Sequence, residues 1–275
     1  MMLEAIFLGI VQGLTEFLPI SSSAHIRILG EFLPSAQDPG ATFTAIMQIG
    51  TEIAVLIFFR NDITRILRAA YRYGFSRNQN NDEGEAKLAL LIVIGSLPIF
   101  VAGFLAQDYI RNNFRSLWLI ATTLIAFGII LGLADHLGRK NKNLNLLNTR
   151  DGLSYGIAQS LALVPGVSRS GATIAMGRAL GYERESALRY SFLLAIPAVL
   201  GSGFYELLQA LNEKPAVFSL METLVATVVA FIVGYAVIAW LMKFIQTKSF
   251  LPFVIYRIAL GALILLLLST GAISA

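Results

Sequence analysis

Two short polar segments interrupt the apolar runs of this chain, and they constrain its fold more than any other feature. The first, residues 12–25, reads QGLTEFLPISSSAH, and the second, residues 159–173, reads QSLALVPGVSRSGAT. Each combines a Gln, a Pro and closely spaced Ser residues, with one residue fewer before the Pro in the second. Matched, Pro-interrupted apolar segments in two halves of a membrane protein point to a binding site near the membrane midplane. Ionisable residues at that depth are costly, so they indicate function.

The rest of the chain has the composition of an integral membrane protein. Of its 275 residues, 56% are hydrophobic and 14% are charged, whereas a soluble domain carries about 25% charged residues. The apolar runs are long and do not alternate, so we predict an all-α polytopic membrane protein and not a barrel. The absence of cysteine excludes thiol chemistry and disulfides. No basic residue precedes the first apolar run, so we expect no cleaved signal peptide.

Six apolar segments are long enough to be transmembrane helices. They cover residues 42–60, 87–105, 117–135, 188–210, 220–243 and 251–272. The basic segments between them fall on one side of the membrane if both termini lie outside, and basic loops usually face the cytoplasm. This bias accounts for the net charge of +4 without nucleic-acid binding. We therefore predict a multi-pass membrane protein in which the basic loop of residues 61–86 lies in the cytoplasm and its run of Asn, Asp and Glu at 78–85 is solvated.

The two polar segments lie within helices that are too short to span a membrane. We predict one pair at 3–18 and 24–33 and another at 151–166 and 168–181, broken at Pro19 and at Pro165-Gly166. Such pairs are typical of re-entrant helical hairpins, although the first could also be one long kinked span.

The predicted topology brings the two hairpins in from opposite sides of the membrane. The chain then forms a single membrane domain of two inverted repeats, residues 1–135 and 151–275. The full prediction is six transmembrane helices plus two re-entrant hairpins.

The turn of each hairpin carries groups that suit a phosphate. Serine is a favourable N-cap residue, and the free N–H groups and positive end of a helix N-terminus bind anions. Arg169 adds a fork of donors that fits phosphate, and glycine allows a ligand close to the backbone. The predicted phosphate-binding residues are Ser21, Ser23, Gly166, Ser168, Ser170 and Gly171.

A second set of residues suggests a metal and a catalytic apparatus. Gln12 and Glu16 are four residues apart, so they share one helix face. A carboxylate facing phosphate would repel it unless a divalent cation, Mg²⁺ or Ca²⁺, bridged them, held by Glu16 and the Gln12 carbonyl. Ser22 and His25 are three residues apart and offer a nucleophile and a proton carrier. With Arg169 they supply the parts for phosphoryl transfer.

Several alternatives stay open at this point. Ser22 is the preferred nucleophile, but His25 could attack phosphorus itself or activate a water molecule. Each residue alone also has an ordinary structural explanation, such as interhelical hydrogen bonding by Ser or snorkelling by Arg. Glu52 lies inside a predicted span and either lines the cavity or pairs with Arg257.

With these motifs the chain resembles the bacterial undecaprenyl-diphosphatase family, also called the bacitracin resistance protein family. The family's first motif stands here as Gln12, Glu16, Phe17-Leu18-Pro19, Ser21-Ser22-Ser23 and His25, and its second as residues 165–173. The likeness extends to Gln48-Ile49-Gly50, residues 192–197 and Tyr256-Arg257. Position 12 is Gln where some members have Glu, which leaves Glu16 as the one acidic metal ligand of this motif.

The resemblance implies removal of one phosphate from undecaprenyl diphosphate, which regenerates the lipid carrier for peptidoglycan synthesis. It also implies a location in the bacterial cell membrane, dependence on a divalent cation, an active site open to the outer face, and a place for Thr173 in phosphate binding. Bacitracin would compete indirectly, by binding the lipid substrate. The alternative function is a transporter or flippase of an anionic lipid or solute, because inverted repeats with broken helices occur in transporters. Chain-length preference stays open, as does a homodimer.

Overall fold

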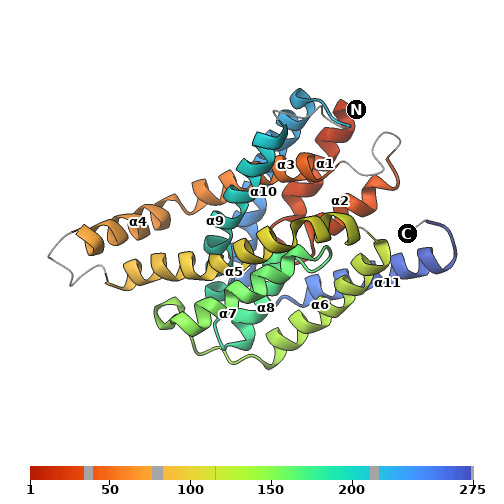
Figure 1. Ribbon diagram of the computed structural model, residues 1–275. Helices are drawn as coiled ribbons and strands as arrows, with labels where there is room; N and C mark the ends of the chain where they lie inside the picture. The colour runs from red at the N-terminus through yellow and green to blue at the C-terminus, as the bar shows by residue number, and fades with distance from the viewer. Residues whose placement is uncertain (34–39, 76–82, 115, 211–216, 274–275) are drawn as a thin grey trace.

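The computed structural model describes residues 1–33, 40–75, 83–114, 116–210 and 217–273 (Figure 1). Within these ranges the chain is helical, and its one extended pairing is an isolated bridge between Lys142 and Tyr182. The α-helices are α1 (Met2–Thr15), α2 (Ser22–Gly30), α3 (Ala41–Phe58), α4 (Arg60–Phe75), α5 (Glu83–Asn113), α6 (Leu117–Leu137), α7 (Thr149–Ser160), α8 (Arg169–Ala179), α9 (Arg184–Ala210), α10 (Leu220–Thr247) and α11 (Leu251–Ser269). Two short 3₁₀ helices, η1 (Leu144–Leu146) and η2 (Leu161–Leu163), flank α7.

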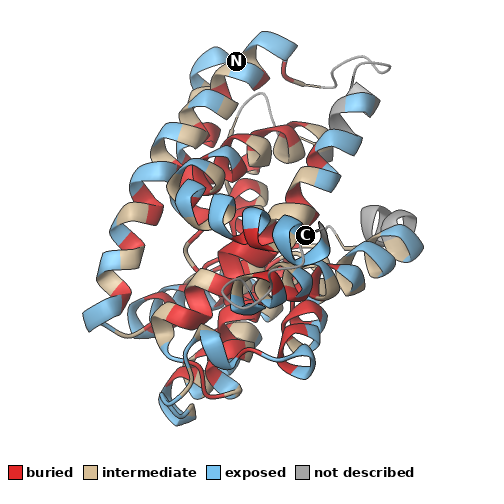
Figure 2. Ribbon diagram, turned by 90° about the vertical axis from the view of Figure 1, so that its left-hand side faces the viewer, coloured by how far each residue is buried: buried red, intermediate tan, exposed pale blue. Residues whose placement is uncertain are grey.

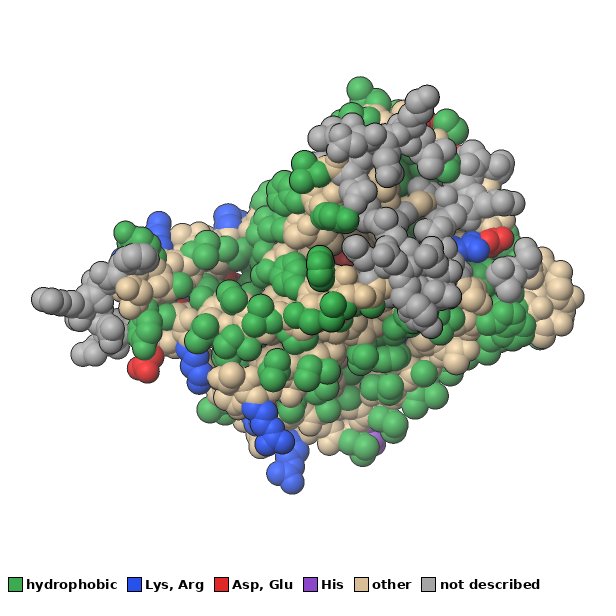
Figure 3. Space-filling view, in the orientation of Figure 1, with side chains coloured by type: hydrophobic (Ala, Val, Ile, Leu, Met, Phe, Trp, Pro, Cys, Tyr) green, Lys and Arg blue, Asp and Glu red, His purple; other side chains and the backbone are tan. Residues whose placement is uncertain are grey.

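Five of these helices, α5, α6, α9, α10 and α11, are each long and apolar enough to cross a membrane. Helices α3 and α4 pass the same test together, as a pair bent by 76°, which gives up to six spans in the described part of the chain. The surface seen in Figure 3 is largely hydrophobic, and most of its visible basic side chains lie toward the left and lower-left margins. The prediction of an all-α polytopic membrane protein is confirmed at this level.

The chain is helical over Arg60–Phe75 and again from Glu83, so the prediction of a loop was wrong for these residues. Most of the predicted solvated run at 78–85 lies outside the described residues. After α3 the chain bends sharply into α4, which runs beside the start of α5 as an arm at the left of Figure 1. Asp62 pairs with Arg189 at 2.5 Å and Arg65 pairs with Glu85 at 2.7 Å, which ties α4 to α9 and α5. The missed signal was the helical spacing of apolar residues between the arginines.

The first helix of each broken pair, α1 or α7, packs closely against a long helix through glycine. Helix α1 packs on α10, where a Cβ at Gly9 would lie 2.5 Å from the Ala226 carbonyl oxygen. Helix α7 packs on α5, where a Cβ at Gly156 would lie 2.2 Å from the Gly95 carbonyl oxygen. Gly9 and Gly156 hold the same place in the repeated sequence. The two polar segments are therefore held against the long helices by matching contacts.

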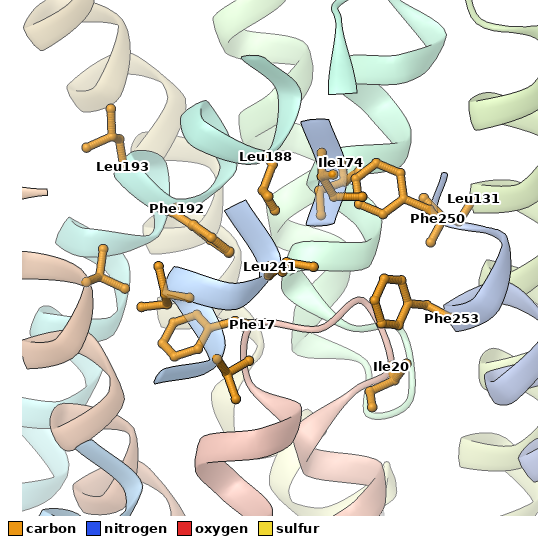
Figure 4. Close-up of a cluster of buried hydrophobic side chains, with 14 of the residues drawn as sticks. Phe17, Ile20, Leu131, Ile174, Leu188, Phe192, Leu193, Leu241, Phe250 and Phe253 are labelled. Carbon is orange, nitrogen blue, oxygen red and sulfur yellow. The ribbon is translucent and has the colours of Figure 1, made fainter. Parts of the chain in front are cut away.

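Both predicted breaks are present, one between α1 and α2 and the other between α7 and α8. Buried residues concentrate toward the middle of the molecule, while the outer helix faces are exposed (Figure 2). Phe17 and Ile20, on the turn after α1, belong to the largest buried apolar cluster, together with side chains from α9, α10 and α11 (Figure 4). The Phe17 and Phe192 rings meet edge to face, with centroids 5.4 Å apart. This packing fixes the turn that carries Glu16 and the serines.

Candidate active site

The N-termini of α2 and α8 are built in the same way. Ser21 and Ser168 are the N-cap residues, and both adopt the left-handed backbone region, with φ of 73° and 70°. Non-glycine residues rarely adopt such angles, and when they do the strain often lies at a functional site. The Ser21 hydroxyl accepts a hydrogen bond from the Ala24 N–H, and the Ser168 hydroxyl accepts one from the Gly171 N–H.

A buried arginine ties the two turns together. Arg257 of α11 is 0% exposed. Its Nη1 donates to the Pro19 carbonyl at 3.0 Å, and its Nη2 donates to the Gly166 and Val167 carbonyls at 2.8 and 3.0 Å. Its Nε donates to the Leu124 carbonyl at 3.1 Å. One guanidinium thus satisfies backbone groups of both breaks, which fixes their separation.

We expect Arg257→Leu to destabilise the protein and to reduce activity, because the carbonyls of both turns would lose their donor. A hydrogen bond to a charged group contributes about 1.5–3 kcal/mol, so the loss of several should be large. Thermal unfolding in detergent measures it, with exposed Arg150→Leu as the matched control. Equal melting temperatures for the two variants would contradict this role for Arg257.

The Glu16 carboxylate is the centre of the polar cluster at the turns. Its Oε2 accepts hydrogen bonds from Gln12 Nε2 at 2.8 Å and from Ser22 Oγ at 2.5 Å. Its Oε1 accepts one from Arg169 Nη2 at 2.8 Å. Gln12 and Ser22 belong to the first broken helix and Arg169 to the second. A carboxylate in this position can take a proton from the Ser22 hydroxyl.

A cavity of about 490 Å³ opens beside this cluster. Its polar lining comprises Glu16, Ser21, Ser22, Ser23, Gln48, Ser168, Arg169 and Ser202. Its apolar lining includes Ile99, Phe100, Phe104, Leu163, Ala198 and Val199. Sites of this kind bury a ligand against apolar walls and orient it with a few polar groups. The cavity therefore suits a molecule with an anionic end and a hydrocarbon body.

His25 does not form the predicted pair with Ser22. Its Nδ1 lies 2.7 Å from the Ser21 carbonyl oxygen and its Nε2 lies 2.8 Å from the Tyr256 hydroxyl. The His25 and Tyr256 rings are also stacked, with centroids 5.6 Å apart. Ser22 bonds instead to Glu16, which lies across the turn. The partner of Ser22 is thus a carboxylate brought in by the fold and not its neighbour on the helix.

The remaining predicted phosphate-binding residues divide between the cavity and the backbone around it. The Ser23 hydroxyl lies 3.2 Å from the hydroxyl of the N-cap residue Ser21, and the Ser170 hydroxyl lies 3.2 Å from that of the N-cap residue Ser168. The Gly166 carbonyl faces Arg257. Among these, Ser21, Ser23 and Ser168 line the cavity.

The hydroxyl of Thr173, which the resemblance assigns to phosphate binding, is hydrogen-bonded within the protein. This hydroxyl donates to the Arg169 carbonyl at 2.8 Å and pairs with Ser191 of α9. It therefore helps to hold the first turn of α8 in place.

Several buried oxygen atoms near Glu16 have no hydrogen-bond partner. They are Gln12 Oε1 and both carboxylate oxygens of Glu52. The described residues contain no group of three or more His, Cys, Asp or Glu side chains placed to hold a metal. Two carboxylates and an amide oxygen nonetheless match the oxygen ligands of Mg²⁺ or Ca²⁺, which complete their coordination with water and phosphate. The residues present fit a divalent cation shared with a phosphate.

Neither alternative considered for Glu52 matches the structure, because Glu52 is not among the residues that line the cavity and Arg257 is not its partner. The Glu52 carboxylate Oε2 lies 3.9 Å from Arg169 Nη1. Arg257 donates its hydrogen bonds to backbone carbonyls. Sequence analysis noted Gln48 only as part of the family likeness and gave it no role, yet it lines the cavity one helical turn before Glu52 on α3. Its signal was the spacing of four between two polar residues in an apolar helix.

Known proteins match this chain over nearly its full length. Residues 5–263 match the family model described as bacitracin resistance protein BacA. The chain is 60% identical over 275 residues to the undecaprenyl-diphosphatase of Micrococcus luteus, covering 99% of both chains. It is 55% identical over 273 residues to undecaprenyl-diphosphatase 2 of Agrobacterium fabrum, covering 99% of this chain and 98% of the relative. It is 53% identical over 274 residues to the undecaprenyl-diphosphatase of an Arthrobacter species, covering 99% and 96%.

Proposed function

The chain belongs to the bacitracin resistance protein BacA family, and we propose that it removes the terminal phosphate of undecaprenyl diphosphate in the cavity beside Glu16. One observation carries this assignment. The Ser22 hydroxyl bonds to a carboxylate that is paired with Arg169, at the polar end of an otherwise apolar cavity. The product, undecaprenyl phosphate, is the lipid carrier that peptidoglycan synthesis reuses, and bacitracin acts against this cycle by binding the diphosphate.

The substrate binds with its diphosphate at the N-termini of α2 and α8. The N–H groups of these first turns and the Arg169 guanidinium supply the donors. The prenyl chain lies along the apolar wall formed by residues of α5 and α9, such as Phe100 and Val199. This arrangement matches the two chemical parts of the substrate to the two parts of the cavity.

In the first step Glu16 accepts the Ser22 proton while Ser22 Oγ attacks the terminal phosphorus. The bond from that phosphorus to the bridging oxygen breaks, and its electron pair leaves with undecaprenyl phosphate. Water then attacks the phosphoserine, the Ser22 oxygen regains a proton, and inorganic phosphate leaves. Arg169 holds the charge that develops on the phosphoryl oxygens. His25 keeps the turn in place through Ser21 and Tyr256.

A divalent cation would be held by Glu16 and Gln12 Oε1. When bound, it supplies positive charge that offsets the repulsion between carboxylate and phosphate and stabilises the phosphoryl oxygens. The partnerless Gln12 Oε1 supports this assignment.

We further propose that residues 1–135 and 151–275 are inverted repeats, each with a re-entrant hairpin. Three observations support this. The N-caps of α2 and α8 share one geometry, and the glycine contacts of α1 and α7 match. In addition, α1 of the first repeat packs on α10 of the second, and α7 of the second repeat packs on α5 of the first. Both termini lie outside, the basic segments lie in the cytoplasm, and the cavity opens to the extracytoplasmic side of the plasma membrane.

Cysteine labelling of intact cells tests this topology, since the chain has no cysteine of its own. We expect a membrane-impermeant maleimide to label Gly271→Cys near the C-terminus and not Lys140→Cys after α6. Labelling at position 140 before the cells are permeabilised would overturn the proposed orientation.

We expect Arg169→Lys to lower kcat by about 10²–10³, the typical effect of losing one preorganised donor to developing charge. Lysine keeps the charge but loses the planar fork that fits phosphate. Steady-state kinetics with purified protein give the result, with exposed Arg150→Lys as the control. A near-normal kcat in Arg169→Lys would reduce Arg169 to a structural role.

The function itself is tested by phosphate release from undecaprenyl diphosphate with purified protein in detergent. An enzyme turns over without two compartments, whereas a transporter or flippase needs them. Stoichiometric release of inorganic phosphate and undecaprenyl phosphate is the expected result, and no release by folded protein would contradict the proposal.

A further inference from the structure

Glu52 is a buried carboxylate that the mechanism above does not use. It lies on α3, one turn after the cavity residue Gln48, and it is 0% exposed. Neither of its carboxylate oxygens has a hydrogen-bond partner. Burying a charge without a partner is costly, so such a group usually serves a ligand or a reaction.

The ion-pair partner of Glu52 belongs to the site. Its Oε2 lies 3.9 Å from Arg169 Nη1, which is also buried without a hydrogen-bond partner. The other nitrogen of the fork, Nη2, is bonded to Glu16. Two carboxylates therefore share one guanidinium, which leaves the cluster with a net negative charge when both are ionised.

Binding of a diphosphate makes this imbalance worse. In the proposed function Arg169, which lines the cavity, also donates to the phosphoryl oxygens, so its single positive charge is shared among Glu16, Glu52 and the phosphate. Arg257 cannot supply a second cation, because its three nitrogens are bonded to carbonyls. Two buried carboxylates beside a phosphate require a new positive charge, and a hard divalent cation meets that need with oxygen ligands.

We propose that Glu52 is the second acidic ligand of the divalent cation, beside Glu16 and Gln12 Oε1. The proposal rests on the cation site of the proposed function. Position 12 offers only a neutral carbonyl, so Glu52 supplies from α3 the second negative charge that the first broken helix lacks. The site then draws ligands from two elements that packing brings together, and the cation links them.

The test measures cation binding by stability and not by turnover. Thermal unfolding of purified protein in detergent is followed across a Mg²⁺ titration in the presence of inorganic diphosphate. Even partners that only orient a metal ligand typically account for about 10–100-fold in affinity. We expect Glu52→Gln to raise the half-saturating Mg²⁺ concentration by at least about tenfold on that basis. Exposed Glu183→Gln is the matched control and should leave it unchanged.

A compensating variant makes the test specific. Gln12→Glu combined with Glu52→Gln restores two carboxylates to the same cluster, so we expect it to recover most of the Mg²⁺ response. A wild-type midpoint in Glu52→Gln would overturn the proposal. A folded double variant whose Mg²⁺ midpoint does not return toward the wild-type value would overturn it as well. Because this comparison is made with the wild type, it also decides the matter if Glu52→Gln alone does not fold.

Phosphate release by the same wild-type preparation keeps this inference separate from the proposed function. Release with no effect of Mg²⁺ on stability would overturn the cation site and the role of Glu52, and it would leave the phosphatase assignment standing. A Mg²⁺ response that depends on Glu52 without any phosphate release would support the ligand and contradict the enzyme.

Discussion

Glu16→Gln should lower kcat by about 10²–10⁴, the range that a positioned proton acceptor typically contributes. The amide cannot take the Ser22 proton, and it removes the anion that orients Arg169 at 2.8 Å and Ser22 at 2.5 Å. It also removes the negative ligand that the metal proposal requires. The shape of the side chain is kept, so the protein should still insert and fold.

Phosphate release by the purified variant measures the effect of Glu16→Gln, with thermal unfolding as a check on the fold. Glu183→Gln, an exposed substitution of the same type, should retain wild-type turnover. If Glu16→Gln kept the wild-type rate and response to Mg²⁺, both roles assigned to Glu16 would be wrong.

Ser22→Ala should be the most damaging single change, with a loss of at least about 10⁴ in kcat. Removal of a serine nucleophile costs up to about 10⁶ in serine proteases. The substitution is small, and Ser22 makes its one described side-chain hydrogen bond to Glu16, so the turn should remain intact.

Ser160→Ala is the matched control for Ser22→Ala, because that hydroxyl bonds only within its own helix, to the Gly156 carbonyl. It should turn over at the wild-type rate. Substantial activity in correctly folded Ser22→Ala would shift the chemical role to His25 or to water.

Local sequence was enough to predict the broken helices and their caps. Proline ends a helix and serine caps the next one, and both effects depend on only a few neighbouring residues. Ser21 and Ser168 are N-caps, as their position after each Pro indicates. The pairing of Gln12 with Glu16 likewise follows from helical spacing.

Contacts between distant segments could not be predicted in the same way. Spacing of three suggested a bond between Ser22 and His25, yet tertiary packing gives Ser22 to Glu16 and His25 to Tyr256. Arg257 was considered as a partner for Glu52, but it satisfies carbonyls of two breaks that lie far apart in the chain. Which partner each of these side chains takes depends on how α11 and α3 pack. The periodicity of the sequence does not specify that packing.

The segment 61–86 shows a different limit. Its arginines and polar residues suggested a cytoplasmic loop, although a helix with charges on one face and apolar residues on the other has a similar composition. The bend between α3 and α4 and the ion pairs to α5 and α9 depend on the tertiary structure.

The central claim is that Ser22 attacks the terminal phosphorus with Glu16 as its base. Rapid acid quenching of purified protein with undecaprenyl diphosphate labelled in its terminal phosphate tests it most directly, followed by peptide mapping of the label. We predict an acid-stable phosphoserine at Ser22 that is absent in Ser22→Ala. An acid-labile adduct on His25 that survives Ser22→Ala, or no adduct with inversion at a chirally labelled phosphorus, would contradict the claim.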